Sequence, residues 1–92
     1  MKYEVTYTSS FKRDLRKALQ RNYDIEKLKR VVALLEEGKN LPPCYKDHQL
    51  KGNKKDFREL HIENDWLLIY QRNEKILVLT LTRTGTHSDL LE

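Results

Sequence analysis

The sequence predicts an α+β domain in which two helices cover one face of a mostly antiparallel sheet. Three observations support this class: an alternating segment at the start, two consecutive segments with apolar residues at helical spacing, and three strand-like segments separated by turns in the second half. Elements in this order are typical of helices that pack together on one side of a meander. Because two helices of this size cannot cover both faces, we expect the other face to be at least partly open.

The first expected elements are a strand and a helix. Lys2 to Thr8 alternates and is rich in β-branched and aromatic residues, which predicts a strand. Ser9 or Ser10 then supplies a hydroxyl that can accept a backbone N–H bond and cap a helix. The apolar residues of this helix recur at helical spacing: Phe11, Leu15, Ala18 and Leu19.

A second helix is expected after a break from Asn22 to Asp24, and Asp24 is its candidate N-cap. Its apolar stripe consists of Ile25, Leu28, Val31, Val32, Leu34 and Leu35. Gly38 stands where a left-handed C-terminal cap is expected. We therefore expect a helical hairpin whose apolar stripes face the sheet.

The rest of the chain is predicted to be a long loop followed by a meander. Asn40 to Lys55 is irregular because its paired prolines cannot join a strand ladder, and loops of this length are often functional. The candidate strands are Phe57 to Ile62, Trp66 to Gln71 and Lys75 to Thr82 or Arg83, and the tail from Thr84 to Glu92 is a candidate for a short final strand.

Length and composition limit the class of protein. Ninety-two residues predict a single domain spanning 1–92, and no apolar run reaches the roughly 18 residues of a membrane span. The segment MKYEVTYTSS lacks the pattern of a signal peptide, so we expect a soluble cytoplasmic protein. The single cysteine, Cys44, excludes an internal disulfide and a multi-cysteine zinc site, and we expect it to be a small buried residue.

Positive charge is concentrated in two parts of the chain. Lys12 to Arg30 holds eight basic and three acidic residues, and Lys46 to Arg58 holds five basic and two acidic residues, within a formal net charge of +4. Clustered positive charge attracts polyanions through counterion release, and nucleic acid is the commonest polyanion in the cytoplasm. The simpler explanation, that Lys and Arg keep a small domain soluble, stays open at this point.

All three histidines lie in the second half of the chain, and each has an aspartate near it: Asp47 beside His48, Asp65 near His61, and Asp89 near His87. Cleavage of RNA by its own 2′-hydroxyl needs a base for the hydroxyl proton, an acid for the departing 5′ oxygen and cations for the phosphorus oxygens. Imidazoles and carboxylates supply the first two without a metal. Candidate cations are Arg58, Arg83 and the loop residues Lys46, Lys51, Lys54 and Lys55.

Each of these residue types also has a purely structural explanation. A histidine can be a surface residue, Asp65 can be a turn residue, and Trp66 fits a core position as well as a base-stacking position. Arg58 and Arg83 can belong to surface ion pairs, and the loop lysines can simply be solvated. A zinc site is poorly supported because the histidines are thirteen and twenty-six residues apart, without HxH or HxxxH spacing.

Three segments of the chain carry a family resemblance. They are YKDHQLKG (Tyr45 to Gly52), DFRELHIENDWLLIY (Asp56 to Tyr70) and RTGTHSDLL (Arg83 to Leu91). In order and spacing they resemble the YafQ-type toxins of the RelE superfamily, the toxin half of bacterial type II toxin–antitoxin modules. The resemblance covers nearly the full length. It implies the RelE-like microbial ribonuclease fold, with an N-terminal strand, a helical hairpin and an antiparallel meander of three to four strands.

The resemblance also implies an activity and partners. Toxins of this type are endoribonucleases that need no metal or other cofactor and cut messenger RNA in the A site of the 70S ribosome. They are held inactive by an antitoxin similar to DinJ, and they contact operator DNA only through the antitoxin complex. No membrane is involved.

Position by position, the resemblance implies that the catalytic histidines are His48, His61 and His87 and that the motif's Asp and Trp are Asp65 and Trp66. Arg83 matches a basic position that related toxins use near the phosphate. Leu91 stands where the family pattern has Phe. Because Leu cannot stack on a base, we expect this substrate contact to change the rate or the codon preference rather than abolish activity.

We expect His87 to donate the proton to the leaving 5′ oxygen and His48, His61 or Asp65 to accept the 2′-hydroxyl proton. Arg83 would stabilise the phosphorane. The alternative from a different class is a non-catalytic basic module that inhibits translation by occupying the ribosome or RNA, since charge and fold fit that function equally well. A relative that keeps the antitoxin surface and has lost its activity is a third possibility.

Overall fold

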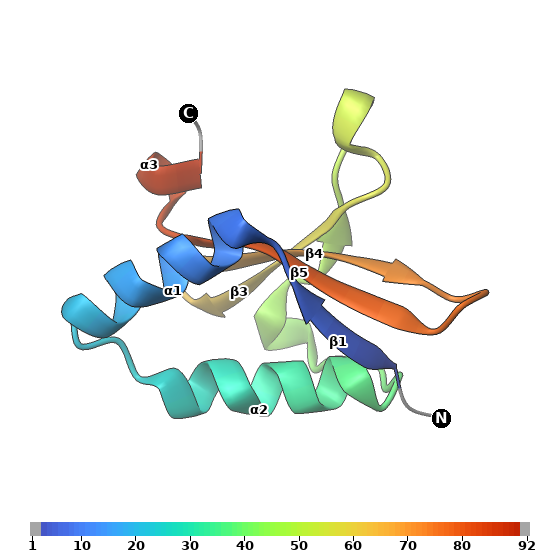
Figure 1. The fold of residues 1–92 in the computed structure, drawn as a ribbon, viewed down its shortest axis with the longest axis horizontal. Helices are drawn as coiled ribbons and strands as arrows, with labels where there is room; N and C mark the ends of the chain where they lie inside the picture. Colours follow the sequence, from blue (N-terminus) through green and yellow to red (C-terminus); the bar gives the residue numbers. More distant parts are fainter. Residues whose placement is uncertain (1–2, 91–92) are drawn as a thin grey trace.

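The computed structural model describes residues 3–90, and its elements follow the expected order. Strand β1 (Glu4–Tyr7) leads into helices α1 (Ser9–Gln20) and α2 (Ile25–Glu36). The long connection contains the 3-10 turns η1 (Pro43–Tyr45) and η2 (Gly52–Lys54) on either side of strand β2 (His48–Gln49). Strands β3 (Arg58–Glu63), β4 (Trp66–Asn73) and β5 (Val78–Gly85) and the short helix α3 (His87–Leu90) follow (Figure 1).

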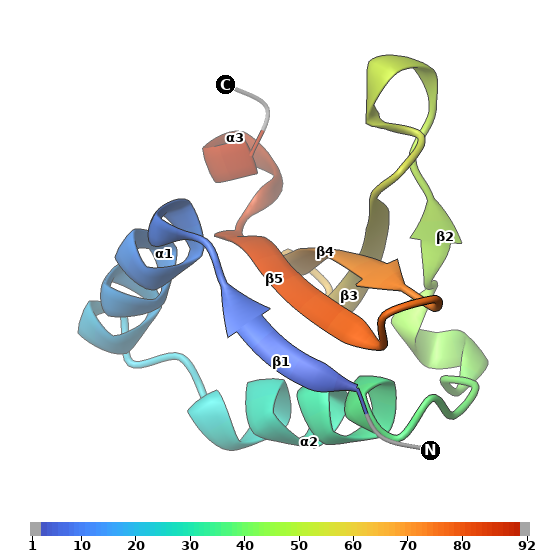
Figure 2. The same cartoon turned by 45° about the vertical axis from the view of Figure 1, so that its right-hand side comes forward.

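The strands form one five-stranded sheet in the order β1-β5-β4-β3-β2 (Figure 2). β1 pairs in parallel with β5, and the β5–β4, β4–β3 and β3–β2 pairs are antiparallel. A parallel pair needs a crossover connection, which here is the helical hairpin between β1 and the meander. The predicted fold class, an α+β domain with a strand, two helices and a mostly antiparallel sheet, is therefore confirmed.

The start of α1 is fixed by Thr8. Its hydroxyl accepts a hydrogen bond from the Phe11 N–H at 3.0 Å and donates one to the Thr82 carbonyl at 2.7 Å. The expectation that Ser9 or Ser10 caps this helix is wrong. Thr8 takes the position because its hydroxyl satisfies the helix and β5 together, which ties the beginning of α1 to the sheet.

The other helix signals are mostly confirmed. Asp24 caps α2 by accepting the Glu26 N–H at 3.1 Å, and Gly38 has a φ of 74°, the left-handed conformation expected after a helix. Leu19 is 54% exposed and does not belong to the buried stripe of α1. A buried position on this helix belongs instead to the charged Asp14, whose partners lie in β5.

The core lies between the helices and one face of the sheet. Leu60 and Ile62 of β3 are buried, whereas His61 between them is partly exposed, as strand alternation requires. The core cluster consists of Tyr3, Phe11, Leu28, Val31, Leu35, Leu60, Ile62, Trp66, Leu68, Tyr70, Leu79 and Leu81. In Figure 1, α2 lies below the sheet, while α3 and the loop of η2 rise above it. No long helix within residues 3–90 covers that upper face, which agrees with the expected open face.

Several segments differ from the expectation. Lys2 lies outside the described residues, and β1 begins at Glu4. The tail forms α3 rather than a final strand, because Thr86 accepts the Asp89 N–H at 3.1 Å and starts a helical turn. The long loop is partly ordered into β2 and two 3-10 turns. Cys44 is exposed rather than buried, since η1 lies on the surface.

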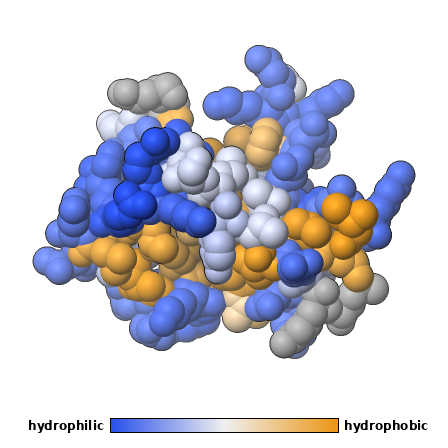
Figure 3. All heavy atoms as spheres, viewed as in Figure 1, coloured by the Kyte–Doolittle hydropathy of each residue, from blue (hydrophilic) through white to orange (hydrophobic). Residues whose placement is uncertain are grey.

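The face seen in Figure 3 is mainly hydrophilic. Hydrophobic side chains gather on it between α1 and α2 and at the turn joining β4 to β5, where Ile76 is 67% exposed. Over residues 3–90, the structure contains no helix with the length and apolar character that crossing a membrane requires.

Candidate active site

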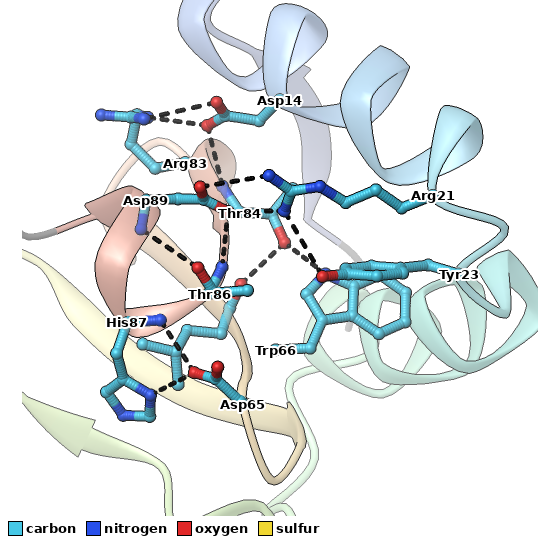
Figure 4. A network of polar contacts seen from close by, with 11 residues as sticks. Asp14, Arg21, Tyr23, Asp65, Trp66, Arg83, Thr84, Thr86, His87 and Asp89 are labelled. Carbon is cyan, nitrogen blue, oxygen red and sulfur yellow. Dashed lines mark hydrogen bonds and ion pairs between the residues drawn. The ribbon is translucent and has the colours of Figure 1, made fainter.

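Helix α3 brings His87 against the turn between β3 and β4. One carboxylate oxygen of Asp65 accepts the backbone N–H of His87 at 2.9 Å and its ring Nδ1–H at 2.5 Å (Figure 4). These bonds, the backbone one first, hold the pKa of the Asp65 carboxyl below its ordinary value of 3.8. Asp65 therefore stays anionic near neutral pH and fixes the orientation of the imidazole. Both side chains are more than half exposed, so a substrate can reach the pair.

His61 completes this group from β3. Its ring centroid lies 5.6 Å from that of His87, and the two ring planes are 61° apart. Three of the residues predicted to be catalytic thus lie together. They are His61 of β3, Asp65 of the turn between β3 and β4, and His87 of α3.

A second set of bonds fixes α3 itself. The Thr86 N–H donates to Asp89 Oδ2 at 2.9 Å, and the Asp89 N–H returns a bond to the Thr86 hydroxyl. Arg21, just after α1, donates to both oxygens of Asp89 at 2.8 and 3.3 Å (Figure 4). This guanidinium holds the pKa of the Asp89 carboxyl well below its usual range. A Cβ at Gly85 would lie 2.9 Å from Asp89 Cβ, so glycine is needed for α3 to pack this closely.

β2 places His48 near the same face of the sheet. Its Nδ1–H donates to the Lys46 carbonyl at 2.7 Å, because a carbonyl can only accept. The other nitrogen, Nε2, lies 3.5 Å from Oε1 of Glu59, its cross-strand neighbour. Glu59 precedes His61 by two residues in β3, and residues two apart share a face. Glu59 could not be recognised from the sequence, since only the pairing of β2 with β3 places it beside His48.

Arg83 is bound to a helix residue. Its Nε donates to Asp14 Oδ2 at 2.7 Å and its Nη2 to Oδ1 at 3.3 Å, and the same Oδ2 accepts the Thr84 N–H at 3.1 Å. β1 ends at Tyr7, so this part of β5 has no strand partner on that side, and Asp14 satisfies its backbone instead. The Arg83 side chain is still 33% exposed, which leaves it accessible to an anion. Asp14 could not be recognised from the sequence, because an acidic residue in a basic helix resembles a surface residue.

Comparison with known proteins identifies the family. Residues 3–92 match the model of a family described as "Bacterial toxin of type II toxin-antitoxin system, YafQ". The chain belongs to the YafQ toxin family. The resemblance inferred from the three sequence motifs is confirmed.

Individual YafQ-like proteins match over almost their full length. The mRNA interferase toxin YafQ of Escherichia coli strain K12 is 40% identical over 88 residues, which cover 95% of this chain and 94% of that protein. A chain of the crystal structure of the E. coli DinJ–YafQ toxin–antitoxin complex matches with a TM-score of 0.91 and 36% identity over 100% of both chains. A metal-bound toxin from Helicobacter pylori matches with a TM-score of 0.90 and 40% identity over 96% of this chain and 98% of that one.

The YafQ-motif tryptophan, Trp66, is a core residue in this chain. Its side chain is 3% exposed, its Nε1–H donates to the Thr84 hydroxyl at 2.9 Å, and its ring centroid lies 4.9 Å from that of Tyr23 (Figure 4). The expectation that Trp66 binds substrate is corrected, because a ring covered on both sides offers no face to a base. Burial of a large apolar side chain decided its position.

Arg58, another predicted substrate contact, bonds to Asp47. Its Nη2 and Nε lie 3.1 to 3.4 Å from the carboxylate, which raises the pKa of Arg58, and the Tyr70 hydroxyl donates to the same carboxylate at 2.6 Å. Burial, followed by this bond, raises the pKa of Tyr70 above its usual range. This network anchors the residue that precedes His48, so Arg58 supports the site by holding β2 in place.

The remaining predicted substrate contacts are four exposed lysines and one residue outside the described range. The lysines predicted to bind substrate are exposed: Lys46, Lys51, Lys54 and Lys55. Leu91 lies outside the described residues. Between residues 3 and 90, no three His, Cys, Asp or Glu side chains gather closely enough to hold a metal ion.

Proposed function

We propose that this chain is an endoribonuclease that cuts messenger RNA in the ribosomal A site by acid–base catalysis with its own side chains. The observation that carries the proposal is the Asp65–His87 pair beside the ring of His61 on an accessible part of the sheet. Membership of the YafQ family, and 40% identity to a protein named an mRNA interferase, support messenger RNA as the substrate.

In this proposal His87 is the general acid. Asp65 accepts a hydrogen bond from the Nδ1–H of His87, which leaves Nε2 of that ring to face the substrate. The 2′-oxygen attacks the phosphorus, the bond from phosphorus to the 5′ oxygen breaks, and His87 gives its Nε2 proton to that oxygen. The products are a 2′,3′-cyclic phosphate on one fragment and a 5′-hydroxyl on the other.

The base must take the 2′-hydroxyl proton. Asp65 is a poor candidate because its lowered pKa makes it a weak base, so we assign the role to His48 or His61. Glu59, 3.5 Å from His48 Nε2, would stabilise the imidazolium that His48 becomes after accepting the proton. Arg83 would offset the charge that develops on the phosphorus oxygens, and the loop lysines would add to this.

We also propose the partners of this activity. A DinJ-like antitoxin is the inhibitor, since a chain from the E. coli DinJ–YafQ complex matches over the full length. The 70S ribosome and its message are the other partners, and operator DNA is contacted only through the antitoxin complex. A ribosome-bound substrate places the activity in the cytoplasm.

The competing function is a basic module that blocks translation by occupancy without cutting. The net charge of +4 and the exposed loop lysines fit this function as well. The Asp65, His61 and His87 group argues against this function, because occupancy requires no acid–base set, and so does the 40% identity to a protein named an mRNA interferase.

Primer extension on a defined message in a translating extract distinguishes these functions. Wild-type protein is compared with a His48→Ala, His61→Ala, His87→Ala triple variant, with and without ribosomes. Cuts that need ribosomes, fall in frame and vanish in the triple variant support the A-site ribonuclease. An uncut message with blocked translation in both samples would leave the occluding module.

A further inference from the structure

A hollow of about 320 Å³ lies beside His61, at the edge of β3. It is lined by residues from α2, from η1 and the residue after it, and from the end of β3: Lys27, Arg30, Cys44, Tyr45, Lys46, His61, Ile62, Glu63 and Asn64. His61 thus borders both this hollow and the group formed with Asp65 and His87.

The hollow exists because β2 is short. β2 pairs only with the first two residues of β3, through His48 with Glu59 and Gln49 with Arg58. From Leu60 onward, β3 has no strand beside it on that edge within residues 3–90. The space is framed instead by α2 below and by η1 at the side, and it opens to solvent next to the proposed site.

The lining carries three cations and one carboxylate. Lys27 bonds to Glu63 at 3.0 Å, so these two charges largely neutralise each other. Arg30 and Lys46 are exposed and make no side-chain hydrogen bond or ion pair with any residue from 3 to 90. They leave the hollow with an uncompensated positive charge and with donors that have no protein partner.

Lys46 connects this hollow to the catalytic face. Its backbone is left-handed, with a φ of 52°, a conformation that a non-glycine residue seldom adopts. In this conformation its carbonyl accepts the Nδ1–H of His48 at 2.7 Å while its side chain lines the hollow. One residue therefore positions a proposed base and contributes a free ammonium group to the neighbouring space.

We propose that the hollow binds a phosphate of an RNA backbone adjacent to the cut, held by Arg30 and Lys46. The inference rests on the proposed function and extends it to a residue of α2. A guanidinium binds phosphate through two parallel N–H bonds, and an ammonium adds a point charge, which together suit one phosphate group. Because His61 separates the hollow from His87, a chain that leaves the cleavage site over β3 would place a flanking phosphate here.

The test measures cleavage and binding for Arg30→Gln, Lys46→Gln and the double variant. Arg16→Gln is the matched control, because Arg16 is an exposed arginine of α1 outside the hollow and loses the same charge. For Arg30→Gln we expect KM for ribosome-bound message to rise about 10-fold with kcat nearly unchanged, since Arg30 belongs to α2 and has no part in the proposed chemistry. Lys46→Gln should raise KM by a similar factor of about 10 and also lower kcat, since the loop lysines help to offset the charge on the phosphorus oxygens. The control should stay within about twofold of wild type.

A second arm uses an oligonucleotide with a 2′-deoxy nucleotide at the cleavage site, which binds and cannot be cut. Each lost phosphate contact should reduce the slope of log affinity against log salt by about 0.7. A single neutral methylphosphonate linkage at the contacted position should remove the difference between wild type and Arg30→Gln. If the variants differ from wild type only on ribosomes, the contact is with the ribosome and not with a phosphate adjacent to the cut, which overturns the inference.

Two further results would overturn the inference. One is that both hollow variants behave like the control Arg16→Gln in both arms. The other is weakened binding of the antitoxin with unchanged RNA binding, which would make the hollow an antitoxin contact. The oligonucleotide arm does not depend on cutting. Loss of the proposed activity in wild type and loss of this phosphate site are therefore observed separately.

Discussion

A single carboxylate oxygen of Asp65 receives both the backbone N–H and the ring Nδ1–H of His87, at 2.9 and 2.5 Å. The first bond fixes where α3 starts, and the second fixes the direction of its imidazole. Asp65 belongs to the turn after β3, so the position of His87 depends on the sheet as well as on its own helix. A turn residue here performs the positioning task of an active-site residue.

Asp65→Asn should lower cleavage about 10- to 100-fold while leaving the fold intact. The amide oxygen can still accept the backbone N–H of His87, but it carries no charge to favour the protonated ring. Asp65→Ala removes both bonds and should lower cleavage further. Single-turnover cleavage of ribosome-bound message measures both variants, with circular dichroism as a control for folding. Equal activity of wild type and Asp65→Asn would remove the charge of Asp65 from the mechanism.

Gly85→Ala should reduce cleavage more than it reduces stability. Its new Cβ would meet Asp89 Cβ and Oδ2 at 2.9 Å, which forces α3 and His87 away from Asp65. Displacements of this kind typically cost about 100-fold in rate. Gly52→Ala is the control, because its Cβ meets nothing within 4 Å and its positive φ strains only the loop. Similar loss of activity in both variants would contradict the packing argument.

Trp66→Phe should destabilise the fold by about 1–2 kcal/mol and leave KM for the message unchanged. The change removes the bond from Nε1 to the Thr84 hydroxyl and leaves a gap beside Tyr23. Urea unfolding gives the free energy, and cleavage is measured well below the unfolding temperature. A stable variant with a raised KM would restore the base-stacking role that burial excludes.

Acidification should weaken the packing of α3, because protonation of Asp89 removes the charge that binds Arg21. The bond from Arg21 lowers the pKa of this carboxyl from its ordinary value of 3.8, so the folded state binds the proton less readily than the unfolded chain. The resulting stabilisation is fully present above the unfolded pKa and is lost as the pH falls from there toward the folded pKa. The urea midpoint of wild type should therefore fall more between about pH 7 and about pH 2 than that of Asp89→Asn. Parallel pH curves for the two proteins would rule this out.

The sequence alone could predict the elements because their signals are local. Alternation in β3, the helical stripe of α2 and the cap at Asp24 are each visible within a few residues. Errors occurred where a residue satisfies two elements together. Thr8 caps α1 because it also bonds to β5, and the tail became a helix because Arg21 and Thr86 hold Asp89.

The residue types of the candidate site could be predicted from the sequence, but only some of the contacts between them could. His61, Asp65 and His87 stand out as titratable groups, and the structure places them together. Asp14 and Glu59 could not be found, since their partners are 69 and 11 residues away. The first contact joins a helix to a strand and the second depends on a strand register, and no local pattern specifies either. Trp66 was misassigned because a motif position does not reveal which way a side chain faces.

The alternation along β3 has a consequence for how such a protein can evolve. Leu60 and Ile62 pack into the core from one face of the strand, while the side chains of Glu59 and His61 are partly exposed on the other face. Under the proposed function, mutations in the second pair would change what is cut, or whether anything is cut, at little cost to folding. A lineage built on this strand can therefore alter its candidate site while its scaffold stays the same.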